Sequence, residues 1–125
     1  MNEKGRHLEA EGRMDYDYVN DILFFKVDKR EYSFSLEFQN MVIDVDEEDF
    51  IVGIQIFNAS EFLGISKANL RLIPKWQFKS RVDNGIIELR LFYQISVRNR
   101  IIEKNPIIIQ RNDAELKSPQ MVATV

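Results

Sequence analysis

The sequence predicts a mainly β protein, in which antiparallel hairpins form a two-layer sandwich or a partly open barrel. Several short segments alternate apolar and polar residues with a period of two, which is typical of strands with one buried face. The dipeptide Asn84-Gly85 separates two such segments and is the preferred sequence of a two-residue hairpin turn. Between the two groups of strands, residues 60–73 predict one or two short helices.

The composition fits one folded domain. Of the 125 residues, 45% are apolar and 30% are charged, and nine Phe, four Tyr and one Trp supply bulky material for a core. Both ends of the chain are polar and show no clear period. We therefore expect a single β-rich domain over residues 14–111, with flexible tails at residues 1–13 and 112–125.

Four strand segments are predicted before the helices, at residues 22–27, 33–38, 41–46 and 51–57. The acidic stretch 46–49 separates the last two of these segments and predicts a hairpin turn. Gly53 lies inside the fourth segment, where a glycine indicates a bulge or a close backbone contact.

The helices and the second hairpin follow. Asn58 or Ser60 can begin a first helical turn that ends at Gly64, and Ser66 can cap a second helix that stops before Pro74. The Asn84-Gly85 turn then fixes a register that can be written down. It pairs Val82 with Ile87, Phe78 with Leu91 and Trp76 with Tyr93 on an apolar face interrupted by Ser80, and Arg81 with Glu88, Lys79 with Arg90 and Gln77 with Phe92 on the other face. Residues 101–111 predict one or two further strands, which Pro106 restricts to an edge or a bulge.

Two motifs near the start of the chain resemble a known family. Tyr16-Asp17, Asp21 and Leu23-Phe24-Phe25 follow the pattern Y-D-x-x-x-D-x-L-[YF], and residues 42–47 lead through the acidic turn to residues 51–60. Over residues 14–66 the chain resembles the domain-of-unknown-function family 2283, which consists of small β-rich prokaryotic proteins. The resemblance implies a hairpin-rich sheet and no established activity; some members look like the small partner of a toxin–antitoxin-like pair. Asp49 stands where the family usually has Gly, and Asp tolerates the left-handed backbone that such a turn needs.

Several chemistries lack the residues that they require. The chain has no Cys, its one histidine is His7 in the predicted tail, and its five Gly are scattered, so thiol, histidine and phosphate-loop chemistry have no support. We expect a non-enzymatic protein without a cofactor. No apolar run reaches membrane-spanning length and the N-terminus is not a signal peptide, so we expect a cytoplasmic protein. The bias toward Ile, Lys, Glu and Arg is typical of thermophile proteins.

The acidic turn offers a weak metal hypothesis. Asp44, Asp46 and Glu48 carry the oxygen ligands that Ca²⁺ or Mg²⁺ prefers. A metal-dependent enzyme that uses Asp44 and Asp46 is therefore one functional alternative. It ranks third, below the nucleic-acid-binding and protein-interaction alternatives described next. The spacing does not follow a calcium-binding loop, and acidic hairpin ends are commonly solvated, so no metal site is expected.

The charge is unevenly distributed along the chain. Residues 15–65 carry twelve acidic and three basic residues, whereas residues 66–125 carry five acidic and eleven basic residues. The second hairpin is expected to gather basic residues beside an aromatic ring on its outer face: Lys75, Lys79, Arg81, Arg90 and Phe92. Such a face can bind phosphates and stack a base, so nucleic-acid binding is the second functional alternative. Alternatively, the acidic residues 15–65 and the basic residues 66–125 attract each other within one fold, and the uneven charge then has no binding function.

The preferred function is protein interaction. The first sheet places Ile22, Phe24 and Phe57, together with Val42 and Ile51, on the face opposite the predicted core. If that face is exposed, it marks an interface; if the second hairpin and the helices cover it, the same residues are core. We therefore expect an interaction or regulatory subunit that binds another protein or itself, as an antitoxin-like partner or a homo-oligomer.

Overall fold

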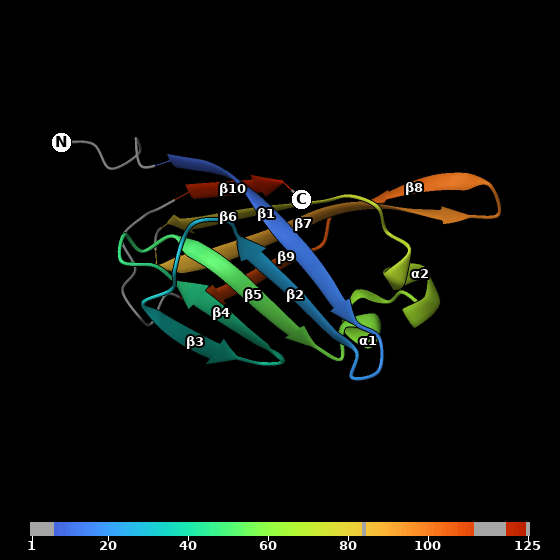
Figure 1. The fold of residues 1–125 in the computed structure, drawn as a ribbon, viewed down its shortest axis with the longest axis horizontal. Coiled ribbons are helices and arrows are strands. Elements are labelled where there is room, and N and C mark those ends of the chain that lie inside the picture. Colours follow the sequence, from blue (N-terminus) through green and yellow to red (C-terminus); the bar gives the residue numbers. More distant parts are fainter. Residues whose placement is uncertain (1–6, 84, 112–119, 125) are drawn as a thin grey trace.

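The computed structural model describes residues 7–83, 85–111 and 120–124, in which ten strands and two short helices form (Figure 1). The elements in chain order are β1 (His7–Asp17), β2 (Ile22–Val27), β3 (Phe34–Phe38), β4 (Met41–Val45), β5 (Ile51–Phe57), α1 (Ala59–Leu63), α2 (Lys67–Arg71), β6 (Trp76–Asp83), β7 (Ile86–Val97), β8 (Arg100–Lys104), β9 (Ile107–Arg111) and β10 (Gln120–Thr124). The mainly β fold class and the short helices after β5 are thus confirmed. No helix in the described part of the chain has the length and apolarity that a membrane crossing requires.

The strands form two layers that share β1. The first sheet has the order β3-β4-β5-β2-β1, and the second continues from β1 through β10, β6 and β7 to β8, with β9 also paired to β7. Figure 1 shows β1 crossing obliquely between the layers. The strand order ends at β3 on one side and at β8 on the other, so the arrangement is an open two-layer sandwich.

Gly12 marks the point where β1 passes from one sheet to the other. Residues 7–11 pair in parallel with β10, and residues 12–17 pair antiparallel with β2. A Cβ atom on Gly12 would lie 2.8 Å from the carbonyl oxygen of Lys26, so a side chain does not fit at this close backbone approach.

The expectation of flexible tails is wrong for residues 7–13 and 120–124, which form β1 and β10. The sequence held a signal for β1, because Leu8, Ala10 and Met14 alternate with charged residues and pack against the core. Gly12 obscured that signal, because a glycine suggests flexibility. In the structure Gly12 instead allows β1 to pass from one sheet to the other. The other residues of the two predicted tails, 1–6, 112–119 and 125, lie outside the described residues.

The core lies between the layers. The ring of Phe25 in β2 packs 5.0 Å from the ring of Phe78 in β6, which joins the two sheets at their centre, and Trp76 packs 4.6 Å from Tyr93 at one end. The most deeply buried residues come from both sheets: Leu23, Val27, Met41, Ile43, Val45, Ile51, Ile56, Phe78, Ile87, Leu89 and Leu91.

The β6–β7 hairpin has the register that the Asn84-Gly85 turn predicts. All six predicted pairs are present, from Val82–Ile87 next to the turn to Trp76–Tyr93 at the far end. Gly85 has a φ of 76°, as a turn of this type requires. Ser80 is buried on the apolar face, as predicted, and its hydroxyl has no hydrogen-bond partner among the described residues.

The β4–β5 turn confirms the role predicted for Asp49. This residue has a φ of 67°, in the left-handed region, at the position where the resembled family usually has Gly. The ladder of β4 and β5 is irregular next to the turn, because the register shifts between Asp44 and Val45. Gly53 lies opposite Asp44, where an added Cβ would be 2.9 Å from a carboxylate oxygen, so the predicted close contact at Gly53 is confirmed.

The two helices have the predicted ends. Gly64 ends α1 with a φ of 68°, and the side chain of Ser66 accepts a hydrogen bond from the Asn69 amide at the start of α2. The guanidinium of Arg71 lies 4.8 Å from the centre of the Tyr18 ring, which holds α2 against the β1–β2 turn.

β8 and β9 lie one after the other along the same edge of β7, opposite β6. Tyr93 pairs with Lys104 and Arg90 with Ile107, and the amide of Leu91 donates to the carbonyl of Pro106 between them. The predicted edge position of Pro106 is confirmed. β7 and β8 extend past α2 as a two-stranded arm, which we define as residues 94–104 (Figure 1).

Candidate functional site

The three interface candidates of the first sheet lie together on its outer face. Ile22 pairs with Phe57, and Phe24 is two residues further along β2. All three side chains are half-buried. The neighbouring strand β1 adds charge, because Asp17 lies opposite Ile22 and Asp15 lies opposite Phe24. This face is therefore a narrow apolar strip within a polar surface.

Ile51 does not belong to that strip. The sequence alternation placed it on the outer face, but Ile51 is 0% exposed and Val52 is 2% exposed. The register shift at Asp44/Val45 brings two consecutive residues of β5 into the interior. A period-two pattern cannot show such a shift, which explains why the prediction for Ile51 is wrong.

The acidic turn binds one of the protein's own cations. The guanidinium of Arg30 contacts the carboxylates of Asp46 and Glu48, and Asp46 also accepts hydrogen bonds from the amides of Glu48 and Phe50. Asp44 is turned to a different partner and accepts from Ser35 at 2.6 Å. Within the described residues no group of three potential ligands is suited to a metal ion. The three weak metal candidates are thus divided between two structural contacts.

The basic residues of the second hairpin gather around Phe92 as the register requires. Lys79 Nζ lies 5.1 Å from the centre of the Phe92 ring, and the Arg90 guanidinium lies 6.0 Å from it. Glu88 lies 3.6 Å from Arg81 and 3.8 Å from Arg90, so it offsets part of the positive charge. Lys75 is exposed just before β6 begins. We refer to Lys79, Arg81, Arg90 and Phe92 as the basic face.

The first motif forms a hydrogen-bond network. Tyr16 donates to Asp21 at 2.6 Å, and Asp21 also accepts from the amide and the hydroxyl of Ser60 at 3.0 and 2.6 Å. Partial burial of Asp21 acts to raise its pKa, but the hydrogen bonds from Ser60 and Tyr16 outweigh it and hold the pKa below its usual range. Burial and the bond to Asp21 raise the pKa of Tyr16 well above its usual range. Asp17 bonds the amide of Asn20 within the turn. These contacts give Asp17 and Asp21 structural roles.

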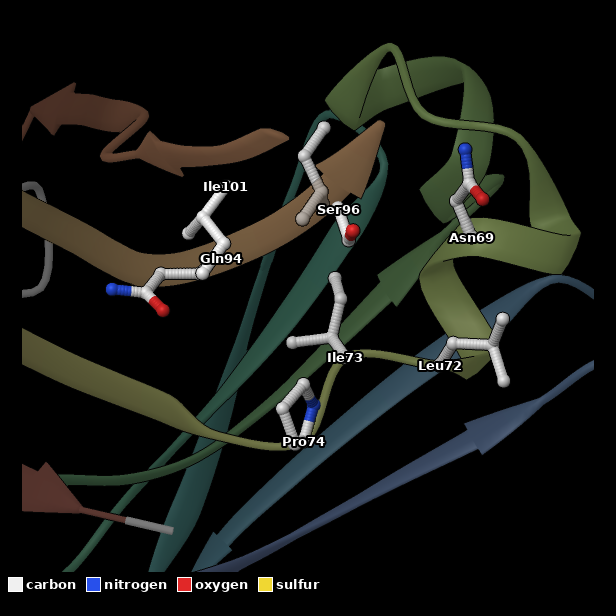
Figure 2. Close-up of a pocket in the computed structure, with 8 residues that line it drawn as sticks. Asn69, Leu72, Ile73, Pro74, Gln94, Ser96 and Ile101 are labelled. Atoms are coloured by element: carbon white, nitrogen blue, oxygen red, sulfur yellow. The ribbon is translucent and has the colours of Figure 1, made fainter. Parts of the chain in front are cut away.

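A further apolar surface lies where the arm meets the segment after α2. Figure 2 shows Ile73 and Pro74 from this segment facing Ser96 and Ile101 of the arm, with Leu72 pointing outward beside them. They line an open cavity of about 310 Å³ whose walls also include Asn69, Gln94 and Ile95. We call this cavity and its rim the arm groove. Leu72 and Ile101 are each 72% exposed.

The arm groove was not predicted from the sequence. Its residues come from two segments that are separated by β6 and most of β7, so no local pattern connects them. One signal was available. Pro74 lacks the amide that would continue the β6–β7 ladder, so the chain must leave β7 there and expose the edge of residues 94–97.

Comparison with known proteins supports the resemblance. Residues 13–60 match the model of a family described as "Protein of unknown function (DUF2283)". The resemblance to the DUF2283 family is confirmed for this segment. Tyr16, Asp21 and Ser60 all lie inside it, so the DUF2283 match includes the whole hydrogen-bond network. The basic face, the arm and β9 lie outside it.

Two curated proteins are similar over more of the chain. A protein of Methanosarcina mazei, named "Putative hypoxanthine phosphoribosyltransferase", is 29% identical over 92 residues, which are 74% of this chain and 75% of that protein. An uncharacterized protein of Methanocaldococcus jannaschii is 28% identical over 111 residues, which are 88% of this chain and 96% of that protein. No solved structure is significantly similar. The similarity thus extends beyond the DUF2283 segment into the second sheet.

Proposed function

We propose that this protein is a non-enzymatic interaction subunit that binds another protein chain through the arm groove. The observation that supports the proposal is the gathering of exposed apolar side chains at one place. Leu72 and Ile101, which both line the groove, are each 72% exposed. Exposed apolar residues that cluster around a concavity mark protein interfaces, because their burial is favourable only when a partner supplies the other surface.

The outer strip of Ile22, Phe24 and Phe57 offers less for binding. Its three side chains are already half-buried, and the acidic residues of β1 adjoin it. An antitoxin-like or regulatory role is compatible with the arm groove, since such a role needs a docking surface and no reacting groups. We therefore assign docking to the groove and leave the strip a structural role.

The activity in the name of the Methanosarcina relative is not proposed for this chain. Phosphoribosyl transfer requires a site that holds a pyrophosphate group, which proteins generally build from a glycine-rich loop or from backbone amides at the start of a helix. The glycines of this chain are scattered, and α1 and α2 have five residues each. A protein-binding role requires neither feature.

Replacing Leu72 by Asp should weaken partner binding through the arm groove. We expect at least about a tenfold loss of affinity, because a charge would replace an apolar contact at the groove rim. Immobilised wild-type protein, Leu72→Asp and the control Tyr32→Asp would be incubated with lysate of the encoding organism, and the retained proteins quantified by mass spectrometry. Tyr32 is 61% exposed in the β2–β3 loop, away from the groove.

The proposal predicts a protein that wild type and Tyr32→Asp retain and that Leu72→Asp loses. If wild type, Leu72→Asp and Tyr32→Asp retain the same proteins in equal amounts, the proposal of docking in the arm groove is wrong.

Nucleic-acid binding by the basic face is the second candidate. The observation that favours it is the position of Lys79 and Arg90 at the ring of Phe92, which combines phosphate-binding cations with a surface for stacking. It ranks second because Glu88 interacts with two of the cations and the whole chain carries a net charge of −3.

If the basic face binds nucleic acid, Lys79→Glu should weaken binding of single-stranded RNA or DNA by about tenfold at low salt. The expected loss reflects the removal of one phosphate contact and the addition of a repulsive charge, and wild-type affinity should fall as salt increases. Fluorescence anisotropy with labelled oligonucleotides measures both effects. An unchanged anisotropy with wild-type protein at low salt would eliminate this candidate.

A further inference from the structure

We propose that two copies of this chain pair along the edge formed by β8 and β9, with β8 of each copy hydrogen-bonded to β9 of the other. The second sheet would then run continuously through both copies. This self-interface goes beyond the proposed function. It shares Ile101 with the arm groove but otherwise uses the outer edge of β8 and β9, and it leaves Leu72 and Ile73 to a different partner.

The edge is long and apolar. Residues 100–111 follow β7 almost without interruption, and no described strand pairs with their outer side. Ile102, Ile107 and Ile109 along it are 38%, 49% and 59% exposed. An exposed strand edge with apolar side chains is a template for pairing with another chain, because its amides and carbonyls lack a ladder partner.

The charges that usually protect a strand edge are absent from one part of this edge, residues 107–110. Proteins block free edges with charges, especially Lys, and with Pro. Here Lys104 and Pro106 lie at the centre of the edge, whereas residues 107–110 carry no charge. A partner strand can therefore lie along β9, provided that the register leaves Pro106 without a ladder hydrogen bond.

The faces of the two strands select a register. Ile101 and Glu103 pair with Ser96 and Gln94 of β7, so they lie on the outer face of the sheet. Ile109 and Arg111 lie on the same face, since their β7 partners also alternate with the buried residues of that strand. An antiparallel pair places outer residues opposite outer residues.

A two-fold axis at Pro106 satisfies this condition. It places Ile101 opposite the partner's Arg111 and Glu103 opposite the partner's Ile109, so that Glu103 is diagonal to the partner's Arg111. The two prolines then face each other where no ladder bond is needed. Opposite charges at a diagonal position are within reach of one another and favour the pairing.

The other self-pairings are less favourable. Pairing β8 with β8 about Ile102 would place Arg100 opposite the partner's Lys104, which are like charges. Pairing β9 with β9 about Ile109 avoids like charges but leaves β8 without a partner. The β8–β9 register uses both strands of each copy. It also places the projecting arm of each copy against β9 of the other.

A charge exchange tests the register. The mass of the wild-type protein by light scattering should be about twice the 14.8 kDa of one chain. Glu103→Arg and Arg111→Glu should each raise the dimer dissociation constant by about tenfold, because each creates a like-charge diagonal twice per dimer. The double variant should regain the wild-type constant. Glu103 and Arg111 are eight residues apart on one edge, roughly 25 Å, so recovery can arise only between copies.

The control is Glu37→Arg on β3, which makes the same change on an exposed strand of the other sheet and should leave the mass unchanged. Thermal unfolding would confirm that each variant is folded. A monomeric wild type, or a dimer that the single variants do not weaken, would overturn the proposed edge pairing. Neither result would affect docking in the arm groove, which depends on Leu72.

Discussion

Replacing Phe78 by alanine is expected to lower the free energy of unfolding by about 3–5 kcal/mol. Phe78 is 0% exposed, and its ring packs against Phe25 across the two layers. The substitution removes a large apolar side chain and leaves a cavity at the centre of the interface between the sheets. Neighbouring strands cannot close this cavity, because their backbone positions are fixed by ladders on both sides.

Urea unfolding of Phe78→Ala measures this loss, with Phe62→Ala as the control. Phe62 in α1 is 37% exposed, so its replacement should cost less than about 1 kcal/mol. Similar losses for the two variants would show that the two sheets do not pack through Phe78.

Replacing Asp21 by asparagine is expected to destabilise the fold by about 1.5–3 kcal/mol at neutral pH. The Asp21 carboxylate accepts from Tyr16 and twice from Ser60, so it joins the β1–β2 turn to the start of α1. An amide keeps one acceptor oxygen but loses the charge that strengthens all three bonds. Asparagine also tolerates the left-handed backbone of Asp21, whose φ is 56°, so the change tests the side chain.

The loss should depend on pH. The pKa of Asp21 is lower in the folded chain than its ordinary value of about 3.9, so its carboxylate stabilises the fold above that value. This stabilisation disappears as the pH falls through the folded pKa. The difference in unfolding free energy between wild type and Asp21→Asn should therefore be largest near pH 7 and smaller near pH 3. An equal difference at both values would contradict the role of the charged carboxylate.

The sequence predicted the fold well where local chemistry decides it. The register of β6–β7 follows from a turn that needs Gly85, and the left-handed residue in the β4–β5 turn could be placed at Asp49. Prediction from the sequence failed where segments far apart in the chain determine the structure. The pairing of β1 with β10 joins opposite ends of the chain, and the shift that buries Ile51 depends on the partner strand.

The candidate sites show the same division. The proximity of Lys79, Arg90 and Phe92 could be predicted, because one hairpin contains all three residues. The arm groove could not, since Leu72 and Ile101 meet only after β6 and β7 have folded. The acidic turn looked like a set of metal ligands because the sequence does not show that Arg30 lies beside it.

Hydrogen exchange of the amides in residues 100–111 tests most directly the claim that β8 and β9 form an interface between two copies of the chain. Outward amides of a free edge exchange quickly, whereas amides in a ladder are protected. The proposed pairing predicts protection in both β8 and β9 that increases with protein concentration and is lost in Glu103→Arg. Fast exchange along this edge at every concentration would contradict it.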